Sequence, residues 1–173
     1  MKSQLQLFRN ECTATERYIT QSLDKLMQLP DSLFKFKKKE NTIILNFNIE
    51  NVGKFCPFEI CFSRNMNTSF LSFHIGIGAE ISCYEKIGTT YDDLLFKDLN
   101  NFFYSNVHAE LYYNGKMEIV KAVYYPNLMI LESLENQGFT TRTGYILPWT
   151  KHKVVILDYS PLIPSDPNCN HKD

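Results

Sequence analysis

The sequence predicts a single α+β domain built on a mostly antiparallel sheet with two or three helices. Three observations lead to this class: segments in which apolar and polar residues alternate, two segments with helical spacing, and an Asn114-Gly115 turn of the kind that joins antiparallel strands. A length of 173 residues suits one domain with its own core. We expect residues 1–160 to form that domain and the proline-containing residues 161–173 to form an irregular tail.

The expected order of elements is α-β-β-β-α-β-β-α-β-β. The first helix is expected over residues 13–29, because Thr13 and Glu16 form a T-x-x-E capping box and Pro30 ends the helical spacing. A similar apolar stripe extends this helix back toward Ser3. The second helix is expected over residues 91–104, where Asp92 and Asp93 suit the positive end of the helix dipole.

Alternation predicts three strands between these helices, over residues 43–50, 58–63 and 71–81. Gly76 and Gly78 fall on one face of the third strand, which indicates a bulge or the close approach of another backbone.

The Asn114-Gly115 turn predicts a hairpin, and its register can be argued from burial. A two-residue loop places Leu111 opposite Glu118. A three-residue loop with a bulged Gly115 places apolar residues on one shared face, and we therefore prefer it. That face would contain Val107, Ala109, Leu111, Met117, Ile119 and Val123. A short helix over residues 128–137 and a last pair of strands, over residues 140–147 and 153–159, complete the domain.

Composition favours a cytoplasmic protein without disulfides. The five cysteines are an odd number at irregular spacing, the first residues lack the apolar core of a signal peptide, and no run approaches the ~20 apolar residues that span a bilayer. The net charge of −1 gives no overall basic field, so nucleic acid is not an expected partner. Residues 80–118 carry seven acidic against three basic side chains, which favours a basic partner for this segment.

Four clusters of residues could carry chemistry or binding. Cys56, Cys61, His74 and Cys83 contain metal-ligand types, but Cys61 and His74 fall within strands and not on a knuckle, so we expect buried thiols, no metal and no cofactor. A second cluster is expected on one face of the hairpin, and it consists of His108, Glu110, Tyr112, Lys116 and Glu118. It could perform general acid–base chemistry, or it could be a solvated sheet face with cross-strand ion pairs.

The third cluster is the basic run Lys35-Phe36-Lys37-Lys38-Lys39, which either contacts phosphate or nucleic acid or is a solvated segment that protects a strand edge. The fourth is Trp149 on an expected hairpin loop, where it either anchors an interface or caps the core. The sequence contains none of the motifs G-x-S-x-G, G-x-x-x-x-G-K-[ST], G-x-G-x-x-G or H-E-x-x-H.

The segment from Leu99 to Pro126 carries a family resemblance. Leu99-Asn100-Asn101-Phe102 ends a helix, the Ser105-Asn106 turn follows, and two strands lead to Pro126. With the preceding helix and three strands, this order resembles the class I chaperones of type III secretion effectors over about residues 13–137. The resemblance implies a small, cytoplasmic, dimeric, non-enzymatic protein that keeps a partner segment extended across a helix-and-sheet surface. The chain departs from that family in its short last helix, the two strands that follow it, and its near-neutral charge.

A second resemblance concerns residues 131–139 and the strands after them, which are similar to the end of small acetyltransferases. The [QR]-x-x-G-x-[GA] loop that those enzymes use to bind coenzyme A does not occur in this sequence.

The leading hypothesis is a non-enzymatic protein-binding module, either a secretion chaperone or an immunity protein that neutralises a basic toxin, with a homodimer as a further expectation. Its expected partner-binding residues are Asp92, Asp93, Glu110, Tyr112, Glu118 and Trp149. The alternative is a small nuclease or acyltransferase that uses His108 with Glu110 or Lys116.

Overall fold

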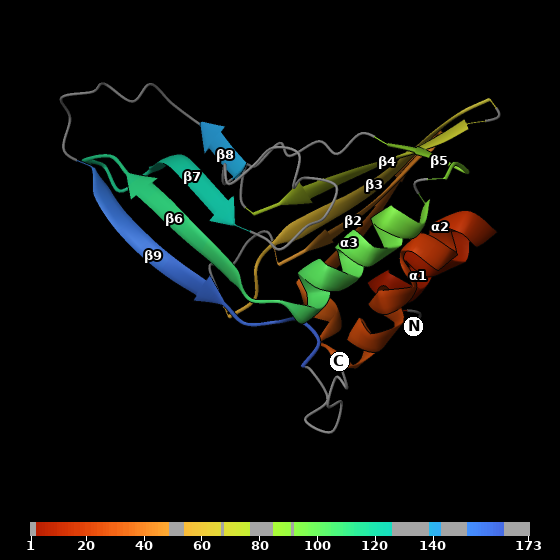
Figure 1. The fold of residues 1–173 in the computed structure, drawn as a ribbon, viewed down its shortest axis with the longest axis horizontal. Helices are drawn as coiled ribbons and strands as arrows, with labels where there is room; N and C mark the ends of the chain where they lie inside the picture. The colour runs from red at the N-terminus through yellow and green to blue at the C-terminus, as the bar shows by residue number, and fades with distance from the viewer. Residues whose placement is uncertain are drawn as a thin grey trace.

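The computed structural model describes residues 3–48, 54–66, 68–76, 85–90, 92–125, 139–142 and 152–164. These residues form two antiparallel sheets, and the helices cover one face of the first sheet (Figure 1). The α+β class with mostly antiparallel neighbours is therefore confirmed, with the strands divided between two sheets.

The first sheet contains, in spatial order, β1 (Phe34–Lys39), β2 (Thr42–Phe47), β3 (Phe58–Asn65), β4 (Thr68–Ile75) and β5 (Glu85–Ile87). The second sheet contains, in spatial order, β8 (Phe139–Arg142), β7 (Ile119–Tyr125), β6 (Val107–Tyr113) and β9 (Lys153–Tyr159). The helical elements are α1 (Gln4–Glu11), α2 (Ala14–Ile19), the 3-10 helices η1 (Gln21–Gln28) and η2 (Asp31–Leu33), and α3 (Asp92–Tyr104). None of the helices in the described ranges is long and apolar enough to cross a membrane.

The predicted helix over residues 13–29 is divided in the structure. The capping box at its start is confirmed, because the Thr13 hydroxyl accepts a hydrogen bond from the Glu16 amide and the Glu16 carboxylate accepts one from the Thr13 amide. The helix nevertheless ends at Ile19, and the chain continues as the 3-10 helix η1. The Thr20 hydroxyl donates to the Glu16 carbonyl and accepts from Arg9, so side chains satisfy the end of α2.

The strands predicted from alternation are confirmed as β2, β3 and β4, although β4 ends at Ile75, and residues 49–50 and 77–81 of the predicted strands lie outside the described residues. Two further strands, β1 and β5, were not predicted. β5 has only three residues, too few to show a pattern. The basic run Lys35–Lys39 lies inside β1, which is the edge strand of the first sheet. These lysines therefore belong to the edge strand and not to a solvated segment beside it. Phe34 is buried and Phe36 is half-buried, whereas the lysines of β1 are exposed.

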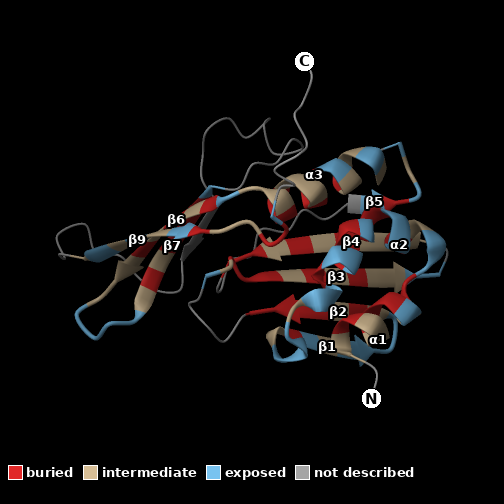
Figure 2. Cartoon of the chain, turned by 90° about the horizontal axis from the view of Figure 1, so that it is seen from below, coloured by how far each residue is buried: buried red, intermediate tan, exposed pale blue. Residues whose placement is uncertain are grey.

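Phenylalanine side chains fill the core between the first sheet and α3. The Phe58 ring stacks on Phe47 with centroids 4.9 Å apart and lies 5.7 Å from Phe102 and 5.4 Å from Phe103. Because strand side chains alternate between faces, the buried residues recur at every second position of β3 (Figure 2). The predicted second helix is confirmed as α3, and its buried residues Leu95, Leu99, Phe102 and Phe103 pack on this core.

The preferred hairpin register is wrong. Leu111 pairs with Ala122 and Ala109 with Tyr124, so Val120, Ala122 and Tyr124 share the buried face in place of Met117, Ile119 and Val123. The physical reason lies in the loop, which is longer than three residues. The Asn114 side chain accepts hydrogen bonds from the amides of Lys116 and Glu118, and Met117, not Gly115, takes the left-handed conformation with φ 62°.

The last two strands do not form the predicted pair. β9 is confirmed at residues 153–159, but it pairs with β6, while β8 pairs with β7 on the opposite side of the sheet. The predicted helix over residues 128–137, most of the strand predicted over residues 140–147, and Trp149 lie outside the described residues. Leu162 and Ile163 of the expected tail are buried, and the Ile163 amide donates to the Phe103 carbonyl at 2.9 Å.

The two sheets meet where β4 ends against β7. Gly76 has φ 83°, and a Cβ atom at this position would lie 2.0 Å from the Tyr124 ring. The close approach predicted from the glycines of this strand is therefore present at Gly76, although the approaching group is an aromatic side chain and not a backbone. Only glycine leaves room for the fully buried Tyr124 ring between the sheets.

Candidate protein-binding site

The second sheet has one face toward the core, and on its opposite face the side chains of β7, β6 and β9 are at least partly exposed except Val123, which is 5% exposed. Val107, Ala109 and Leu111 of β6 are buried, whereas His108, Glu110 and Tyr112 between them point to the opposite face, because strand side chains alternate. We call this opposite face of β7, β6 and β9 the outer face.

Pairing across β7, β6 and β9 arranges the outer face in three rows. The rows are Tyr125–His108–Asp158, Val123–Glu110–Ile156 and Lys121–Tyr112–Val154. Each row combines an apolar or aromatic side chain with a charged one, which is typical of the surfaces that proteins use to bind proteins.

The predicted residues Glu110 and Tyr112 lie together on this face. The Tyr112 hydroxyl donates a hydrogen bond of 2.8 Å to the Glu110 carboxylate, and this bond raises the pKa of Tyr112. The Lys121 ammonium lies 4.8 Å from the centroid of the Tyr112 ring, within the range of a cation–π contact. The two predicted residues therefore hold each other in position at the centre of the outer face.

Three large apolar side chains of the outer face are exposed. Tyr125 is 40% exposed, Val154 46% and Ile156 62%. Single exposed apolar residues are common on proteins, but these three lie on one face of one sheet, Tyr125 on β7 and the other two on β9, with β6 between them. Such grouped exposure indicates an interaction surface. The sequence analysis missed all three, because the apolar run at residues 154–157 does not show which of its members face solvent.

His108 lies on the outer face with Glu110, but Lys116, the other partner expected for an enzyme, does not. Its Nδ1 atom lies 2.8 Å from an Asp158 oxygen on β9, and its ring centroid lies 5.6 Å from that of Tyr125. Lys116 and Glu118 belong to the loop between β6 and β7, so the prediction that they share the strand face of His108 is wrong. Glu118 accepts a hydrogen bond from the Asn114 side chain at 2.8 Å and shapes that loop.

Asp92 and Asp93 occupy a different part of the molecule. They begin α3, whose 13 residues span about 20 Å, and β6 follows the far end of that helix. The Asp92 carboxylate accepts from the Gly88 amide, and Asp93 accepts from the Tyr18 hydroxyl at 2.7 Å, which raises the pKa of Tyr18. A hollow of about 450 Å³ lies here, lined by Ala14, Thr15, Tyr18, Thr89, Thr90, Asp92 and Asp93. The structure therefore does not bring these aspartates together with Glu110 and Tyr112.

Of the Cys/His cluster, Cys61 and His74 are confirmed within strands, and Cys56 precedes β3. Cys61 lies in β3 and His74 in β4, with the His74 ring 3.9 Å from Glu59. Burial raises the pKa of Cys56, so this thiol stays protonated. Within the described ranges, no three His, Cys, Asp or Glu side chains are grouped so as to hold a metal ion.

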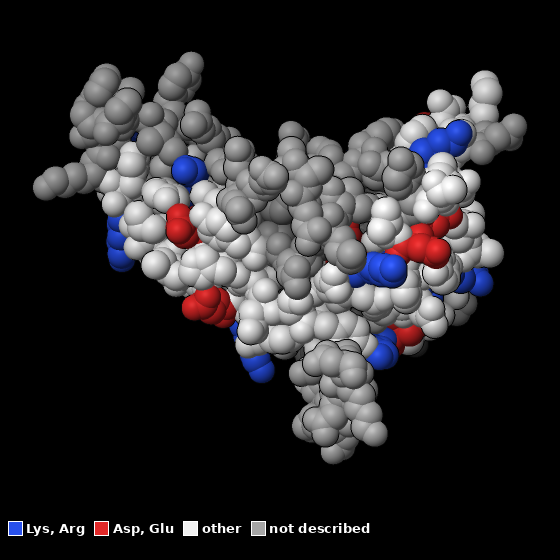
Figure 3. Space-filling view, in the orientation of Figure 1, with Lys and Arg blue, Asp and Glu red and all other residues white. Residues whose placement is uncertain are grey.

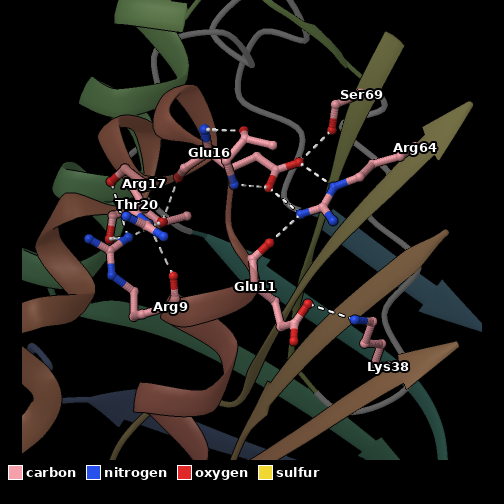
Figure 4. Close-up of polar contacts among 9 residues, drawn as sticks. Arg9, Glu11, Glu16, Arg17, Thr20, Lys38, Arg64 and Ser69 are labelled. Atoms are coloured by element: carbon pink, nitrogen blue, oxygen red, sulfur yellow. Dashed lines mark hydrogen bonds and ion pairs between the residues drawn. The ribbon is translucent and has the colours of Figure 1, made fainter. Parts of the chain in front are cut away.

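A buried polar network joins the N-terminal helices to the first sheet (Figure 4). The Glu16 carboxylate is fully buried and accepts hydrogen bonds from Arg64, Ser69 and the Thr13 amide. Burial alone would raise the pKa of Glu16, but the hydrogen bonds from Arg64, Thr13 and Ser69 outweigh it and lower that pKa. Since all its acceptors are satisfied within the protein, we interpret this cluster as structural.

A second part of the network surrounds Arg9. Its guanidinium donates to the Thr20 hydroxyl at 2.7 Å and to the Arg17 carbonyl at 3.1 Å, and it pairs with Asp24 at 2.8 Å. Arg9 thereby places a positive charge at the carbonyl end of α2. Charged side chains elsewhere are interspersed without a large patch of one sign on the face shown in Figure 3.

Compared with known proteins, the chain matches no family model, no curated protein and no solved structure.

Proposed function

We propose that this chain is a non-enzymatic protein-binding module that holds or neutralises a partner polypeptide in the cytoplasm. The observation that carries the proposal is the outer face, where Tyr125, Val154 and Ile156 are exposed around the hydrogen-bonded pair of Glu110 and Tyr112. Aromatic and aliphatic anchors on a rigid sheet bind a partner with little loss of conformational entropy.

The charges of the outer face indicate the chemistry of the partner. Glu110 and Asp158 supply carboxylates, and the Asp158 side chain is 77% exposed. A partner with an apolar contact surface and basic side chains near its rim would complement both features. The proposed mechanism is occlusion: the apolar side chains exclude water from the contact while the carboxylates pair with the basic groups. A secreted effector held by a chaperone and a basic toxin held by an immunity protein both fit this chemistry.

Affinity purification from the native host tests the proposal. The tagged wild-type chain is expected to recover one partner protein in a fixed stoichiometric ratio. A Tyr125→Ala/Ile156→Ala variant is expected to lose that partner, because both anchors are removed from the outer face. A Met27→Ala/Met66→Ala variant is the matched control, because both methionines are exposed apolar residues outside the second sheet. Recovery of only this chain, as a monomer or homodimer, would count against the proposal.

The enzyme alternative requires a separate test at His108. A His108→Ala variant is expected to keep the biological effect of the chain with at most a modest loss of affinity, because His108 lies on the outer face but is not one of its exposed apolar anchors. Substrate turnover by the purified wild-type chain that disappears in this variant would favour the alternative instead.

A further inference from the structure

The two sheets each end in a long edge strand, and the two edges differ in their side chains. β1, at the edge of the first sheet, carries Lys35, Lys37, Lys38 and Lys39, all of them exposed. Lysines along an edge oppose pairing with another chain, because a second strand would have to bury or approach their charges. The edge formed by β1 is therefore protected against association.

The edge formed by β9 is less protected, because its charged residues, Lys153 and Asp158, flank an apolar middle. Among the described residues, no strand pairs with the side of β9 that faces away from β6, and Figure 1 shows no described element beyond it. Among the residues that the structure describes, the segment before β3 reaches the C-terminal end of β9, where the Ser160 amide donates to the Lys54 carbonyl. Val154 and Ile156, which protrude from the outer face of β9, are exposed apolar residues at an unpaired edge.

We propose that β9 pairs with β9 of a second copy of this chain, antiparallel and centred on Val155. The two four-stranded sheets then join into one continuous sheet, and the two outer faces join into one larger surface. This dimer does not depend on the function proposed above, because β9 of one copy complements β9 of the other without any third protein.

The centre of the pairing follows from symmetry and side-chain chemistry. In a two-fold antiparallel pair, each residue meets a residue on the same face, so the axis must pass through a residue position. Centring on Val155 places Val154 of each copy opposite Ile156 of the other, so this apolar pair forms twice in the interface. It also places His152 opposite Asp158 at each end of the paired segment, where an imidazole complements a carboxylate.

The neighbouring centres are less favourable. Centring on Ile156 places Val154 opposite the carboxylate of Asp158, and centring on Val154 places Ile156 opposite His152. Both arrangements leave an apolar side chain against a polar one, at a cost of roughly 0.2–1 kcal/mol for each lost apolar pair. On the outer face, the Val155-centred register is the one that matches apolar to apolar and polar to polar, while on the inner face it places Lys153 opposite Leu157.

Sedimentation equilibrium of the purified full chain tests the proposal. The wild-type chain is expected to be a reversible dimer with a dissociation constant near the micromolar range, because an edge-strand interface is small. Ile156→Lys and Val154→Lys are each expected to raise that constant about tenfold or more, since each change occurs twice in a symmetric interface. Tyr125→Lys is the matched control, because Tyr125 lies on the same face but on β7, away from the edge, and its dimer is expected to persist.

Thermal unfolding of each variant confirms that it folds, and both lysine substitutions replace exposed side chains. A wild-type chain that stays monomeric at about 100 times the expected micromolar constant would overturn the proposal. A wild-type dimer that neither Ile156→Lys nor Val154→Lys weakens would overturn it as well, because the interface would then lie elsewhere.

Cross-linking tests the register. A short bis-maleimide is expected to link two copies of Val155→Cys, because position 155 meets itself at the axis. Lys153→Cys is the matched control: it lies on the same face of β9, but its counterpart in the other copy is Leu157, so no link through position 153 is expected. Mass spectrometry distinguishes these links from those of the native cysteines. Links at position 153 in place of position 155 would contradict the proposed register.

Discussion

Arg64 on β3 binds the carboxylate of Glu16 on α2 through two hydrogen bonds, Nε to Oε1 at 3.0 Å and Nη2 to Oε2 at 2.6 Å. The same Nη2 atom donates to the Glu11 carbonyl at 2.7 Å. Glu16 is fully buried, so this pair both fixes α2 on the first sheet and neutralises a charge that would otherwise be costly to bury.

Substituting Arg64 by leucine is expected to destabilise the fold by about 3 kcal/mol, because it leaves the Glu16 carboxylate buried without its cation. Urea unfolding at neutral pH measures the change. Lys38→Ala is the control: Lys38 pairs with Glu11 at 2.7 Å, but the two side chains are 50% and 37% exposed, so a loss within about 0.5 kcal/mol is expected. Equal losses in the two variants would contradict the role assigned to Arg64.

The stability of the fold is expected to fall in acid through Glu16. Its pKa is lowered in the folded state from the ordinary value of 4.5, so below that value the unfolded chain binds more protons than the folded chain. The stabilisation from Glu16 is therefore complete above the ordinary value and disappears as pH falls through the lowered pKa. Unfolding free energies measured from neutral pH downward should show a shallower acid decline in Glu16→Gln than in the wild type. Parallel declines in the two proteins would refute this assignment.

Gly76→Ala is expected to destabilise the protein by more than about 3 kcal/mol, because the new methyl group would overlap the buried Tyr124 ring at a residue that also has positive φ. Gly88→Ala separates the two causes, since Gly88 has φ 85° but no atom of the described residues within 4 Å of an added Cβ. Only the backbone strain of about 1 kcal/mol is expected there. Thermal and urea unfolding compare the variants, and a Gly76→Ala loss no larger than that of Gly88→Ala would show that the sheets do not meet as described.

Tyr159→Phe is expected to leave stability unchanged or slightly higher, although Tyr159 is only 1% exposed. Its hydroxyl is buried without a hydrogen-bond partner among the described residues, so removing it takes away a desolvated polar group and breaks none of the described bonds. Tyr159→Ala, which removes the whole ring from the core, is expected to cost about 3 kcal/mol or more. A loss above about 1 kcal/mol for Tyr159→Phe in urea unfolding would mean that the hydroxyl does have a partner.

Local sequence signals predicted the elements whose stability is local. The capping box of Thr13 and Glu16 and the helix that begins at Asp92 both depend on residues within one helical turn. The strands β2, β3 and β4 followed from alternation. The register of β6 and β7 was not predictable in this way. The hydrogen bonds of the Asn114 side chain set the loop length, whereas the Asn114-Gly115 sequence is equally typical of a shorter turn.

The candidate site was predictable only in part, for a related reason. Glu110 and Tyr112 could be placed on one strand face from their spacing. The exposed Val154 and Ile156 could not, because their face depends on pairing between β9 and β6, which are separated by a long stretch of sequence. The pair of Glu16 and Arg64 likewise spans 48 positions and leaves no local pattern.

Site-specific photo-cross-linking in the native host tests the central claim most directly. A benzophenone side chain placed at Tyr112 or Tyr125, on the outer face, is expected to capture the same single partner protein, and one placed at Lys37 on β1 is expected to capture none. The reverse pattern, with capture from position 37 and none from positions 112 and 125, would contradict the claim that the outer face binds the partner.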